Sequence, residues 1–322
     1  MERELALEFV RVTEAAALAA GRLMGRGDKN GADQLAVDAM RSMLDTVNIQ
    51  GTVVIGEGEM DEAPMLYIGE QIGAGVGDPV DIAVDPLEGT NLIAKGSPGA
   101  IAVMAVAPRH HLLHAPDMYM EKIVTGSAGV GVIDLDRPIA ENLEALAKAS
   151  GKAITDLTVV VLDRERHHRL IDAIRAAGAR IKLITDGDVS PAVATCVEGT
   201  GVDMLVGMGG APEGVIAAAA IKCLGGEMKA RLKPEGPEQM ERMLAMGITE
   251  PNRVLELDDL VKGDDVLYVA TGITDGDLLQ GVRYGSRYST THSVVMRSLT
   301  GTVRYVTAHH RNDAKKTSGK RV

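Results

Sequence analysis

The sequence predicts an α/β fold in which an N-terminal mixed α+β sheet domain is joined to a C-terminal domain with a parallel sheet. The second half alternates apolar strand patterns with helical patterns, as βαβ units do. The first half carries short, turn-bounded strand patterns after two helical ones. A chain of 322 residues is long for one core and fits two packed units. We expect domains 1–150 and 151–322, with the boundary near Ser150.

The N-terminal half is expected to begin with an amphipathic helix that ends at about Met24. A second helix is indicated by apolar residues that recur from Leu35 to Leu44. Strand patterns then follow at residues 52–55, 80–84, 100–107, 122–124 and 129–133, and a further helix at 142–149. These short runs predict a mixed sheet flanked by the two N-terminal helices.

The C-terminal half is expected to contain three buried strands, each followed by a helix. The strands are predicted at residues 157–162, 180–185 and 203–208, and the helices at 167–177, 189–197 and 212–224. Because the carboxyl ends of parallel strands meet at one edge of a sheet, the loops that follow these strands must lie together. The polar, basic tail from about His309 is expected to fray.

Composition restricts the kinds of partner. A formal net charge of −11 disfavours nucleic acid, and a chain with no Trp and one Phe has little with which to stack on bases. The longest apolar run, residues 215–221, is too short to cross a bilayer, and the charged N-terminus does not resemble a signal peptide. Cys196 and Cys223 lie in apolar helical patterns and are expected to be buried free thiols. The cytoplasm is therefore the expected compartment, and a small molecule the expected partner.

The hexapeptide at residues 85–90, Asp-Pro-Leu-Glu-Gly-Thr, is the most informative stretch of the chain. It follows an apolar alternating run and places the carboxylates Asp85 and Glu88 around a turn whose φ angle Pro86 restricts. Hard divalent cations prefer such oxygen ligands, and the hydroxyl of Thr90 would sit beside them. The alternative is an ordinary strand that ends in an acidic turn.

Two further carboxylates are candidates for the same site. Glu57 belongs to an acidic cluster that also follows directly on a strand pattern, so two strands end in carboxylates. Asp33 lies where a Gly-rich loop gives way to the second helix. The alternative for Asp33 is a structural one, because an acidic residue in the first turn of a helix offsets the helix dipole.

The loops after the three predicted parallel strands carry charges suited to a small phosphorylated substrate with hydroxyl groups. Arginines can fork onto phosphate oxygens, carboxylates can accept hydrogen bonds from hydroxyls, and a glycine loop lets backbone amides approach an anion. The residues are Arg164, Arg166, Asp186, Asp188, Glu213 and the glycines at 207, 209, 210 and 214. The alternative is routine loop solvation and helix capping. A two-metal phosphomonoesterase would account for both groups, with Thr90 relaying a water proton to Asp33 or Glu57.

The residues at 85–90 resemble the motif of the lithium-sensitive, metal-dependent sugar phosphatase superfamily, Asp-Pro-aliphatic-Asp/Glu-Gly-Thr. The wider sequence resembles the class II fructose-1,6-bisphosphatases from Glu2 to about His310. The matching stretches are residues 25–29, 54–59, 61–67, 115–122, 186–188, 209–214 and 270–274. This resemblance implies an inositol-phosphatase-like layered α/β sandwich. It also implies hydrolysis of the 1-phosphate of fructose 1,6-bisphosphate to fructose 6-phosphate in gluconeogenesis, a requirement for Mg²⁺ or Mn²⁺, and a homodimer or homotetramer.

The resemblance also implies roles for individual positions. The metal-site carboxylates match Asp33, Glu57, Asp85, Glu88 and Glu213, and the position at the attacking water matches Thr90. Lys29 matches a mobile basic loop near the reacting phosphate and is expected, with Thr90 and Asp33, to take part in catalysis; the alternative is an exposed loop lysine. Substrate positions match Glu88, Gly89, Thr90, Tyr119, Arg164, Glu165, Arg166, Asp186, Gly187, Asp188 and Gly210, of which Tyr119 and the two arginines would hold the far phosphate. Glu165 departs from the proline of many relatives and is expected to bring a carboxylate near that phosphate.

Other readings of the sequence stay open. Sedoheptulose 1,7-bisphosphate, one carbon unit longer, is an alternative or second substrate. Inositol phosphates and nucleotide bisphosphates are more distant options, because the chain has no Trp for the second motif of inositol monophosphatases and few aromatics to hold adenine. A catalytically silent, metal-bound sugar-phosphate sensor is a rival of another class. The presence of Thr90 argues against it, because a binding protein has no need of a water-activating hydroxyl.

Overall fold

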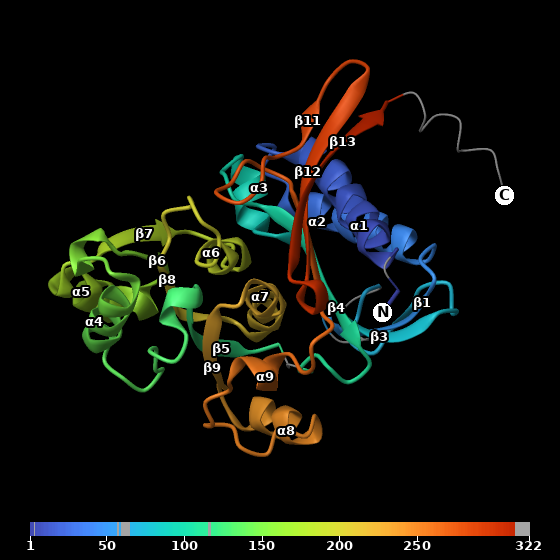
Figure 1. The fold of residues 1–322 in the computed structure, drawn as a ribbon. Helices are drawn as coiled ribbons and strands as arrows, with labels where there is room; N and C mark the ends of the chain where they lie inside the picture. Colours follow the sequence, from blue (N-terminus) through green and yellow to red (C-terminus); the bar gives the residue numbers. More distant parts are fainter. Residues whose placement is uncertain (3, 57, 59–64, 115–116, 313–322) are drawn as a thin grey trace.

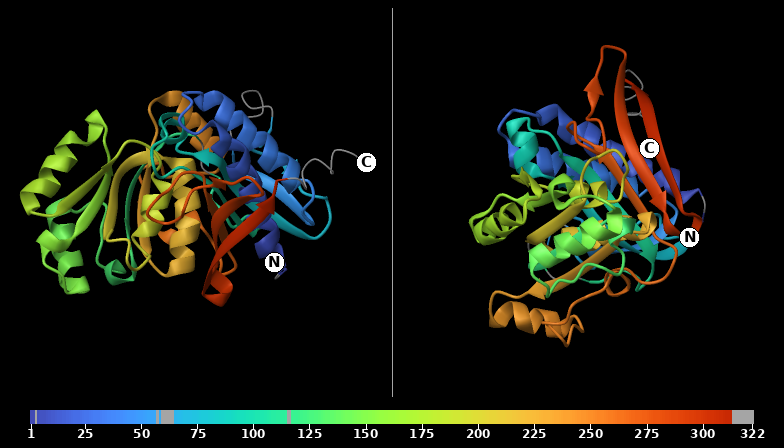
Figure 2. Two further views of the ribbon diagram at one scale, coloured as in Figure 1. Left: turned by 90° about the horizontal axis from the view of Figure 1, so that it is seen from above. Right: turned by 60° about the vertical axis from the view of Figure 1, so that its left-hand side comes forward.

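The computed structural model describes residues 1–2, 4–56, 58, 65–114 and 117–312. Helices and sheets alternate in five layers: α1 and α2, a larger sheet, α6 and α7, a smaller sheet, and α4 and α5 (Figures 1 and 2). Three clusters of buried apolar side chains fill the spaces between these layers. The layered α/β fold that the sequence predicts is therefore confirmed.

The larger sheet has the strand order β11-β12-β10-β4-β3-β1-β2, with β13 paired to β12. Its strands are β1 (Ile49–Ile55), β2 (Gln71–Ile72), β3 (Asp78–Glu88), β4 (Ile101–Pro108), β10 (Leu267–Gly272), β11 (Arg283–Tyr284), β12 (Tyr288–Arg297) and β13 (Thr302–Arg311). β1 and β3 are parallel, whereas β3, β4, β10, β12 and β13 are joined in antiparallel pairs. The sheet is mixed, as expected.

The smaller sheet has the strand order β7-β6-β8-β5-β9. Its strands are β5 (Tyr119–Thr125), β6 (Thr158–Leu162), β7 (Arg180–Ile184), β8 (Met204–Gly210) and β9 (Glu227–Lys233). β6 is parallel to both β7 and β8, which confirms the predicted βαβ units. β5 runs antiparallel to β8 and β9 and extends the sheet beyond its parallel part.

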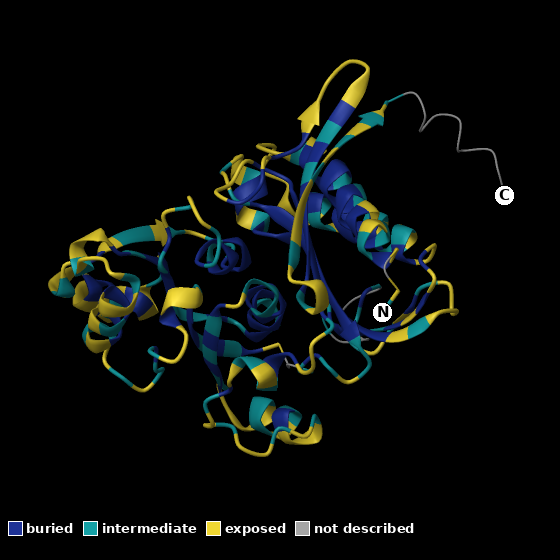
Figure 3. Cartoon of the chain, in the orientation of Figure 1, coloured by how far each residue is buried: buried dark blue, intermediate teal, exposed yellow. Residues whose placement is uncertain are grey.

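The helices cover both outer faces and fill the space between the sheets. They are α1 (Leu5–Ala20), α2 (Lys29–Leu44), α3 (Thr90–Lys95), α4 (Ile139–Ser150), α5 (His168–Ala177), α6 (Val189–Ala194), α7 (Ala211–Leu224), α8 (Pro237–Ala245) and α9 (Leu257–Leu260). α7 contacts strands of both sheets and is buried along most of its length (Figure 3). Its apolar run at residues 215–221 follows from this position, because a helix packed on several sides has no polar face. None of the described helices is long and apolar enough to span a bilayer.

Membership of the two sheets does not follow the expected boundary near Ser150. β5, before that boundary, pairs with β8 and β9, so the prediction that residues 122–124 join the first sheet is wrong. β10 to β13, after the boundary, return to the larger sheet, where β10 pairs with β4. Strand pairing between distant segments depends on side-chain packing across the layers, which local sequence patterns do not encode. A division into domains 1–150 and 151–322 stays a prediction, and the sheets do not divide there.

Three smaller predictions are corrected. Residues 129–133 form the end of a 3₁₀ helix and a turn instead of a strand, because Gly131 adopts a φ of 76° that interrupts extended backbone. β13 continues to Arg311, so the fraying expected from His309 is wrong for residues 309–311, and residues 313–322 lie outside the described chain. Cys196 and Cys223 are free, as expected, although both are partly exposed.

Candidate active site

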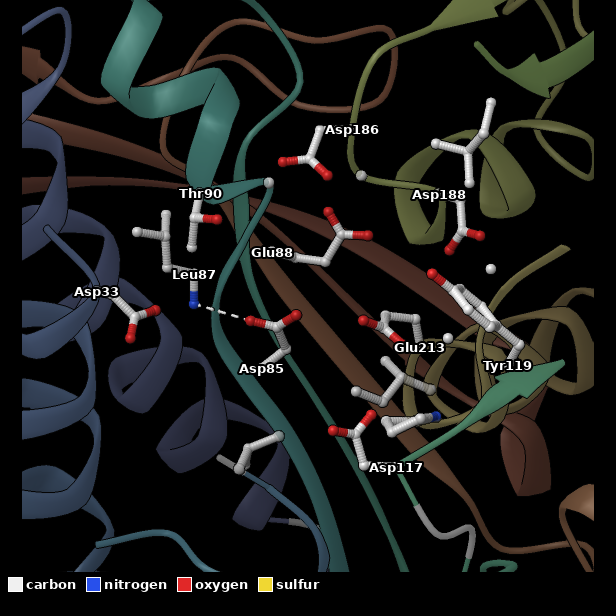
Figure 4. Close-up of a pocket in the computed structure, with 18 of the residues that line it drawn as sticks. Asp33, Asp85, Leu87, Glu88, Thr90, Asp117, Tyr119, Asp186, Asp188 and Glu213 are labelled. Carbon is white, nitrogen blue, oxygen red and sulfur yellow. Dashed lines mark hydrogen bonds between the residues drawn. The ribbon is translucent and has the colours of Figure 1, made fainter. Parts of the chain in front are cut away.

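A pocket of about 490 Å³ opens where the carboxyl ends of β6, β7 and β8 face the turn between β3 and α3. Its size is typical of a small-molecule site. The predicted site residues that line it are Asp33, Asp85, Glu88, Gly89, Thr90, Tyr119, Arg164, Arg166, Asp186, Gly187, Asp188, Gly210 and Glu213. Figure 4 shows the labelled side chains approaching from both halves of the molecule, with Asp33 and Thr90 opposite Glu213 and Tyr119. The fold thus brings together two residue groups that lie far apart in the sequence.

The turn at residues 85–90 places its two carboxylates at different points of the pocket. The pairing of β3 with β4 shifts register between Asp85 and Glu88, so the strand bulges at the proline. Asp85 stays close to the turn, where its Oδ1 accepts a hydrogen bond from the backbone N–H of Leu87 at 3.0 Å. Gly89 then adopts a φ of 90°, which starts α3 at Thr90. The Pro and the Gly of the motif are therefore both explained by local backbone geometry.

Glu88 and Glu213 each present a buried oxygen with no hydrogen-bond partner in the described part of the chain, Oε2 in both cases. Glu88 is 3% exposed, and its other oxygen, Oε1, accepts a hydrogen bond from the backbone N–H of Val189 at 3.0 Å. Burial, with the neighbouring charges of Asp188, Glu213 and Asp186, raises the pKa of Glu88 to about 8. Burial and Asp188 likewise raise the pKa of Glu213. Buried carboxylate oxygens without partners are costly, so this part of the pocket favours a bound cation.

Glycines leave the space that these carboxylates occupy. A Cβ at Gly210 would lie 1.8 Å from Oε2 of Glu213, and a Cβ at Gly187 would lie 2.6 Å from Oε2 of Glu88. Any side chain at these positions would displace the carboxylates, because real Cβ atoms do not approach so closely. The absence of a side chain at Gly210 and Gly187 therefore makes room for the carboxylates of Glu213 and Glu88.

The donor set suits a hard cation such as Mg²⁺ or Mn²⁺. Within the described residues there is no group of three or more His, Cys, Asp or Glu side chains arranged to hold an ion. Glu57, predicted as one of the ligands, lies outside the described residues. Mg²⁺ commonly uses only one or two carboxylates and completes its shell with water and substrate phosphate oxygens. The carboxylates of the pocket fit that mode of binding.

Asp33 lies in the second turn of α2, on the side of the pocket next to Thr90 (Figure 4). The structural alternative for this residue is wrong, because α2 begins at Lys29 and its N-cap is Asp28, whose Oδ1 accepts a hydrogen bond from Gly31 N–H at 2.9 Å. Burial raises the pKa of Asp33, and the charge of Lys29, one helical turn away, opposes that rise. A carboxylate with a raised pKa is suited to accept a proton.

The opposite wall carries the arginines. The guanidinium of Arg166 lies 4.7 Å from the centre of the Tyr119 ring and donates a hydrogen bond to the carbonyl of Met208 at 2.9 Å. Arg164 lies 3.9 Å from Asp186. Asp186 in turn accepts hydrogen bonds from the backbone N–H and side-chain amide of Asn91, at 3.1 and 3.0 Å. The arginine wall is therefore tied to the start of α3 on the other side of the pocket.

A buried histidine anchors the arginine loop. The backbone N–H of Met208 donates to Nε2 of His167 at 2.8 Å, so Nδ1 carries the proton and donates to the carbonyl of Leu162, also at 2.8 Å. Burial lowers the pKa of His167 and favours this neutral form. His167 thereby connects the end of β6 with β8 directly behind Arg166.

The structure differs from the sequence analysis at three residues. Lys29 is the first residue of α2 rather than part of a mobile loop, because Asp28 caps the helix, and it is not among the described residues that line the pocket. Glu165 is exposed on a 3₁₀ turn and is also absent from that lining, so it brings no carboxylate to the pocket wall. Asp117 was missed, although it lines the pocket just before β5. Its place within the matching stretch 115–122, just before a strand, is the signal that could have identified it.

A pocket that combines buried carboxylate oxygens without hydrogen-bond partners among the described residues with nearby arginines is typical of a metal-dependent phosphatase. Comparisons with known proteins agree with this class. Residues 3–310 match the family model described as bacterial fructose-1,6-bisphosphatase, glpX-encoded. The chain belongs to this family.

Curated relatives cover almost the whole chain. The Escherichia coli K12 protein named fructose-1,6-bisphosphatase 1 class 2 is 49% identical over 328 residues, which cover 98% of this chain and 97% of the relative. Proteins named fructose-1,6-bisphosphatase class 2 from Escherichia coli O6:H1 and from Shigella flexneri are similar to the same extent, at 49% identity over 98% of this chain.

Proposed function

We propose that this protein hydrolyses the 1-phosphate of fructose 1,6-bisphosphate to give fructose 6-phosphate and phosphate, as a step of gluconeogenesis. The observation that carries the proposal is the pocket itself, where buried oxygens of Glu88 and Glu213 and the guanidinium groups of Arg164 and Arg166 line one space suited to a small molecule. The names of the relatives identify the substrate of those proteins, and 49% identity over 98% of the chain supports the same substrate here.

Asp33, Glu57, Asp85, Glu88 and Glu213 are proposed to hold the divalent cations, Mg²⁺ or Mn²⁺. When bound, the cations would neutralise charge on the transferring phosphoryl group and lower the pKa of the attacking water. The hydroxyl of Thr90 would accept the proton of that water and pass its own proton to the carboxylate of Asp33, whose raised pKa suits it as the acceptor. Lys29 would act only through its charge on Asp33. Sensitivity to Li⁺ is proposed on the basis of the superfamily motif.

The distal part of the substrate is proposed to lie against the smaller sheet. Tyr119, Arg164 and Arg166 would hold the far phosphate, because guanidinium groups fork onto phosphate oxygens. Asp186 and Asp188 would accept hydrogen bonds from the sugar hydroxyls, and Gly187, Gly210 and the backbone of residues 88–90 would allow close approach. A homodimer or homotetramer is proposed as the assembly.

Phosphate release tests the proposed activity directly. We expect fast release from fructose 1,6-bisphosphate with Mg²⁺ or Mn²⁺, loss of release in EDTA, and inhibition by Li⁺. Sedoheptulose 1,7-bisphosphate and inositol 1-phosphate serve as competing substrates in the same assay. Comparable release from the seven-carbon sugar would make the enzyme bifunctional. Tight sugar-phosphate binding without release from any substrate would instead establish a sensor and refute the role of Thr90.

The glycine at position 187 allows a matched test of the pocket geometry. Gly187 and Gly151 have φ angles of 72° and 69°, so an alanine at either position meets a similar backbone penalty. Only at Gly187 would the new Cβ approach Glu88, because nothing lies within 4 Å at Gly151. We expect Gly187→Ala to lower kcat/KM at least about tenfold and Gly151→Ala to leave it within about twofold. Equal kinetics of the two variants would contradict the assigned contact between Gly187 and Glu88.

A further inference from the structure

A lysine lies buried beneath the pocket and has no part in the mechanism described above. Lys122 is on β5, in the interior of the smaller sheet, and its side chain is 2% exposed. Its Nζ lies 2.8 Å from Oδ2 of Asp188 and donates to the carbonyl of Gly210 at 3.2 Å. A lysine is rarely buried so fully unless it is paired, because desolvation of the ammonium group is costly.

Both partners of Lys122 line the pocket, whereas Lys122 is not among the residues described there. Asp188 follows β7 at the position before α6, and its side chain makes no capping hydrogen bond to that helix. Gly210 ends β8, so one ammonium group joins two loops that come from different strands. In Figure 4, Asp188 lies on the Tyr119 side of the pocket. Lys122 therefore contacts two residues that line the pocket, Asp188 and Gly210, without lining the pocket itself.

The backbone of Gly209 lies close to the ion pair of Lys122 and Asp188. A Cβ at Gly209 would lie 2.2 Å from Oδ2 of Asp188 and 3.1 Å from both Nζ and Cε of Lys122. The backbone of Gly209 therefore covers the pair closely, and one oxygen of Asp188 is confined between β5 and the end of β8. Among the described residues no hydrogen bond involves the other oxygen, Oδ1, and Asp188 lines the pocket.

We propose that Lys122 is a positioning residue for the sugar: it holds Oδ2 of Asp188 and the carbonyl of Gly210 so that Oδ1 of Asp188 can accept a hydrogen bond from a sugar hydroxyl. This inference rests on the proposed function, because it assigns the sugar to that part of the pocket. Lys122 also balances the negative charge of Asp188 and Glu213 without occupying the space of the substrate.

Lys122→Met tests the proposal, because methionine has a similar length and no charge. Lys222→Met is the matched control: Lys222 is 12% exposed and also contacts one carboxylate, of Asp258, and one carbonyl, of Val261, but these lie away from the pocket. We expect Lys122→Met to raise the KM for fructose 1,6-bisphosphate at least about tenfold with a smaller change in kcat, and Lys222→Met to change neither by more than about twofold.

Product inhibition distinguishes the loss of a contact to the sugar from a nonspecific distortion of the whole pocket. In Lys122→Met, the inhibition constant of fructose 6-phosphate should rise at least about tenfold, while that of inorganic phosphate should stay within about twofold. The double variant Lys122→Met/Asp188→Asn should have a KM within about threefold of that of Asp188→Asn alone, because the two residues act as one unit. If Lys122→Met fails to fold, Lys122→Arg, which keeps the charge but alters its geometry, is expected to show the same split in the two inhibition constants.

Equal increases in both inhibition constants, or additive effects of the two substitutions, would refute the proposal. So would kinetics of Lys122→Met equal to those of Lys222→Met. The proposed function fails by a different result, namely the absence of metal-dependent phosphate release by the wild-type protein and by Lys222→Met.

Discussion

Replacing Thr90 with alanine is expected to lower kcat at least about a hundredfold while leaving the affinity for metal and substrate almost unchanged. Thr90 begins α3 at the edge of the pocket, on the same side as Asp33 (Figure 4). Its hydroxyl is the group proposed to relay the proton of the attacking water, and a general-base relay typically contributes a factor of this size. The measurement is steady-state phosphate release, combined with calorimetric titration of Mg²⁺ and fructose 6-phosphate.

Thr90→Ser is the control, because it keeps the hydroxyl and removes only a methyl group. We expect it to retain most of the turnover. Undiminished kcat in Thr90→Ala would remove Thr90 from the reaction. A loss of kcat that is accompanied by equal losses of metal and substrate affinity would instead show that Thr90 has a structural role at the start of α3.

Replacing Glu88 with glutamine is expected to lower kcat about a thousandfold or more and to change how the stability of the metal-free protein depends on pH. In the unfolded chain Glu88 ionises near 4.5, whereas in the folded protein burial and neighbouring carboxylates raise its pKa to about 8. The neutral carboxyl therefore contributes stability that is fully present below pH 4.5 and is lost as the pH rises through about 8. Glutamine does not ionise, so the part of this pH dependence that is due to Glu88 disappears.

Thermal unfolding in EDTA at pH 5, 6, 7 and 8 measures this effect. The Tm of the wild type should fall between pH 5 and pH 8 by at least about 5 °C more than the Tm of Glu88→Gln. Adding Mg²⁺ or Mn²⁺ should raise the Tm of the wild type more at pH 8 than at pH 6, since binding requires ionised carboxylates. Glu144→Gln, at an exposed position of α4, should behave as the wild type does. Parallel pH profiles for wild type and Glu88→Gln would refute the raised pKa.

Local patterns in the sequence predicted the elements that carry the pocket. The strands β6, β7 and β8 and their helices lie within a few residues of the predicted ranges, because short buried strands and amphipathic helices have distinct apolar periods. The rule that parallel strands present their carboxyl ends at one edge then placed Arg164, Arg166, Asp186, Asp188 and Glu213 together, as the pocket shows. The turn at residues 85–90 also follows from Pro and Gly chemistry that acts within six residues.

Contacts between distant segments could not be read from the sequence in this way. One local feature was also missed, because Lys29 was expected in a mobile loop, whereas Asp28 caps a helix that begins at Lys29. Glu165 has the same charge as the pocket carboxylates but is exposed outside the pocket. Asp117 and Lys122, which the sequence analysis did not single out, lie at the wall of the pocket and beneath it.

The sequence by itself determined the class of fold, most of the local elements and the chemical character of the site, because periodicity, turn geometry and residue type act over short distances. Tertiary structure decided which sheet each strand joins: β5 enters the smaller sheet, and β10 to β13 return to the larger one. It also decided that, among the described residues, Oε2 of Glu88 and Oε2 of Glu213 are buried without hydrogen-bond partners, and that Lys122 pairs with Asp188. These features depend on burial and on close contacts between segments about a hundred residues apart, such as Glu88 with Val189, and only packing of the whole chain creates them.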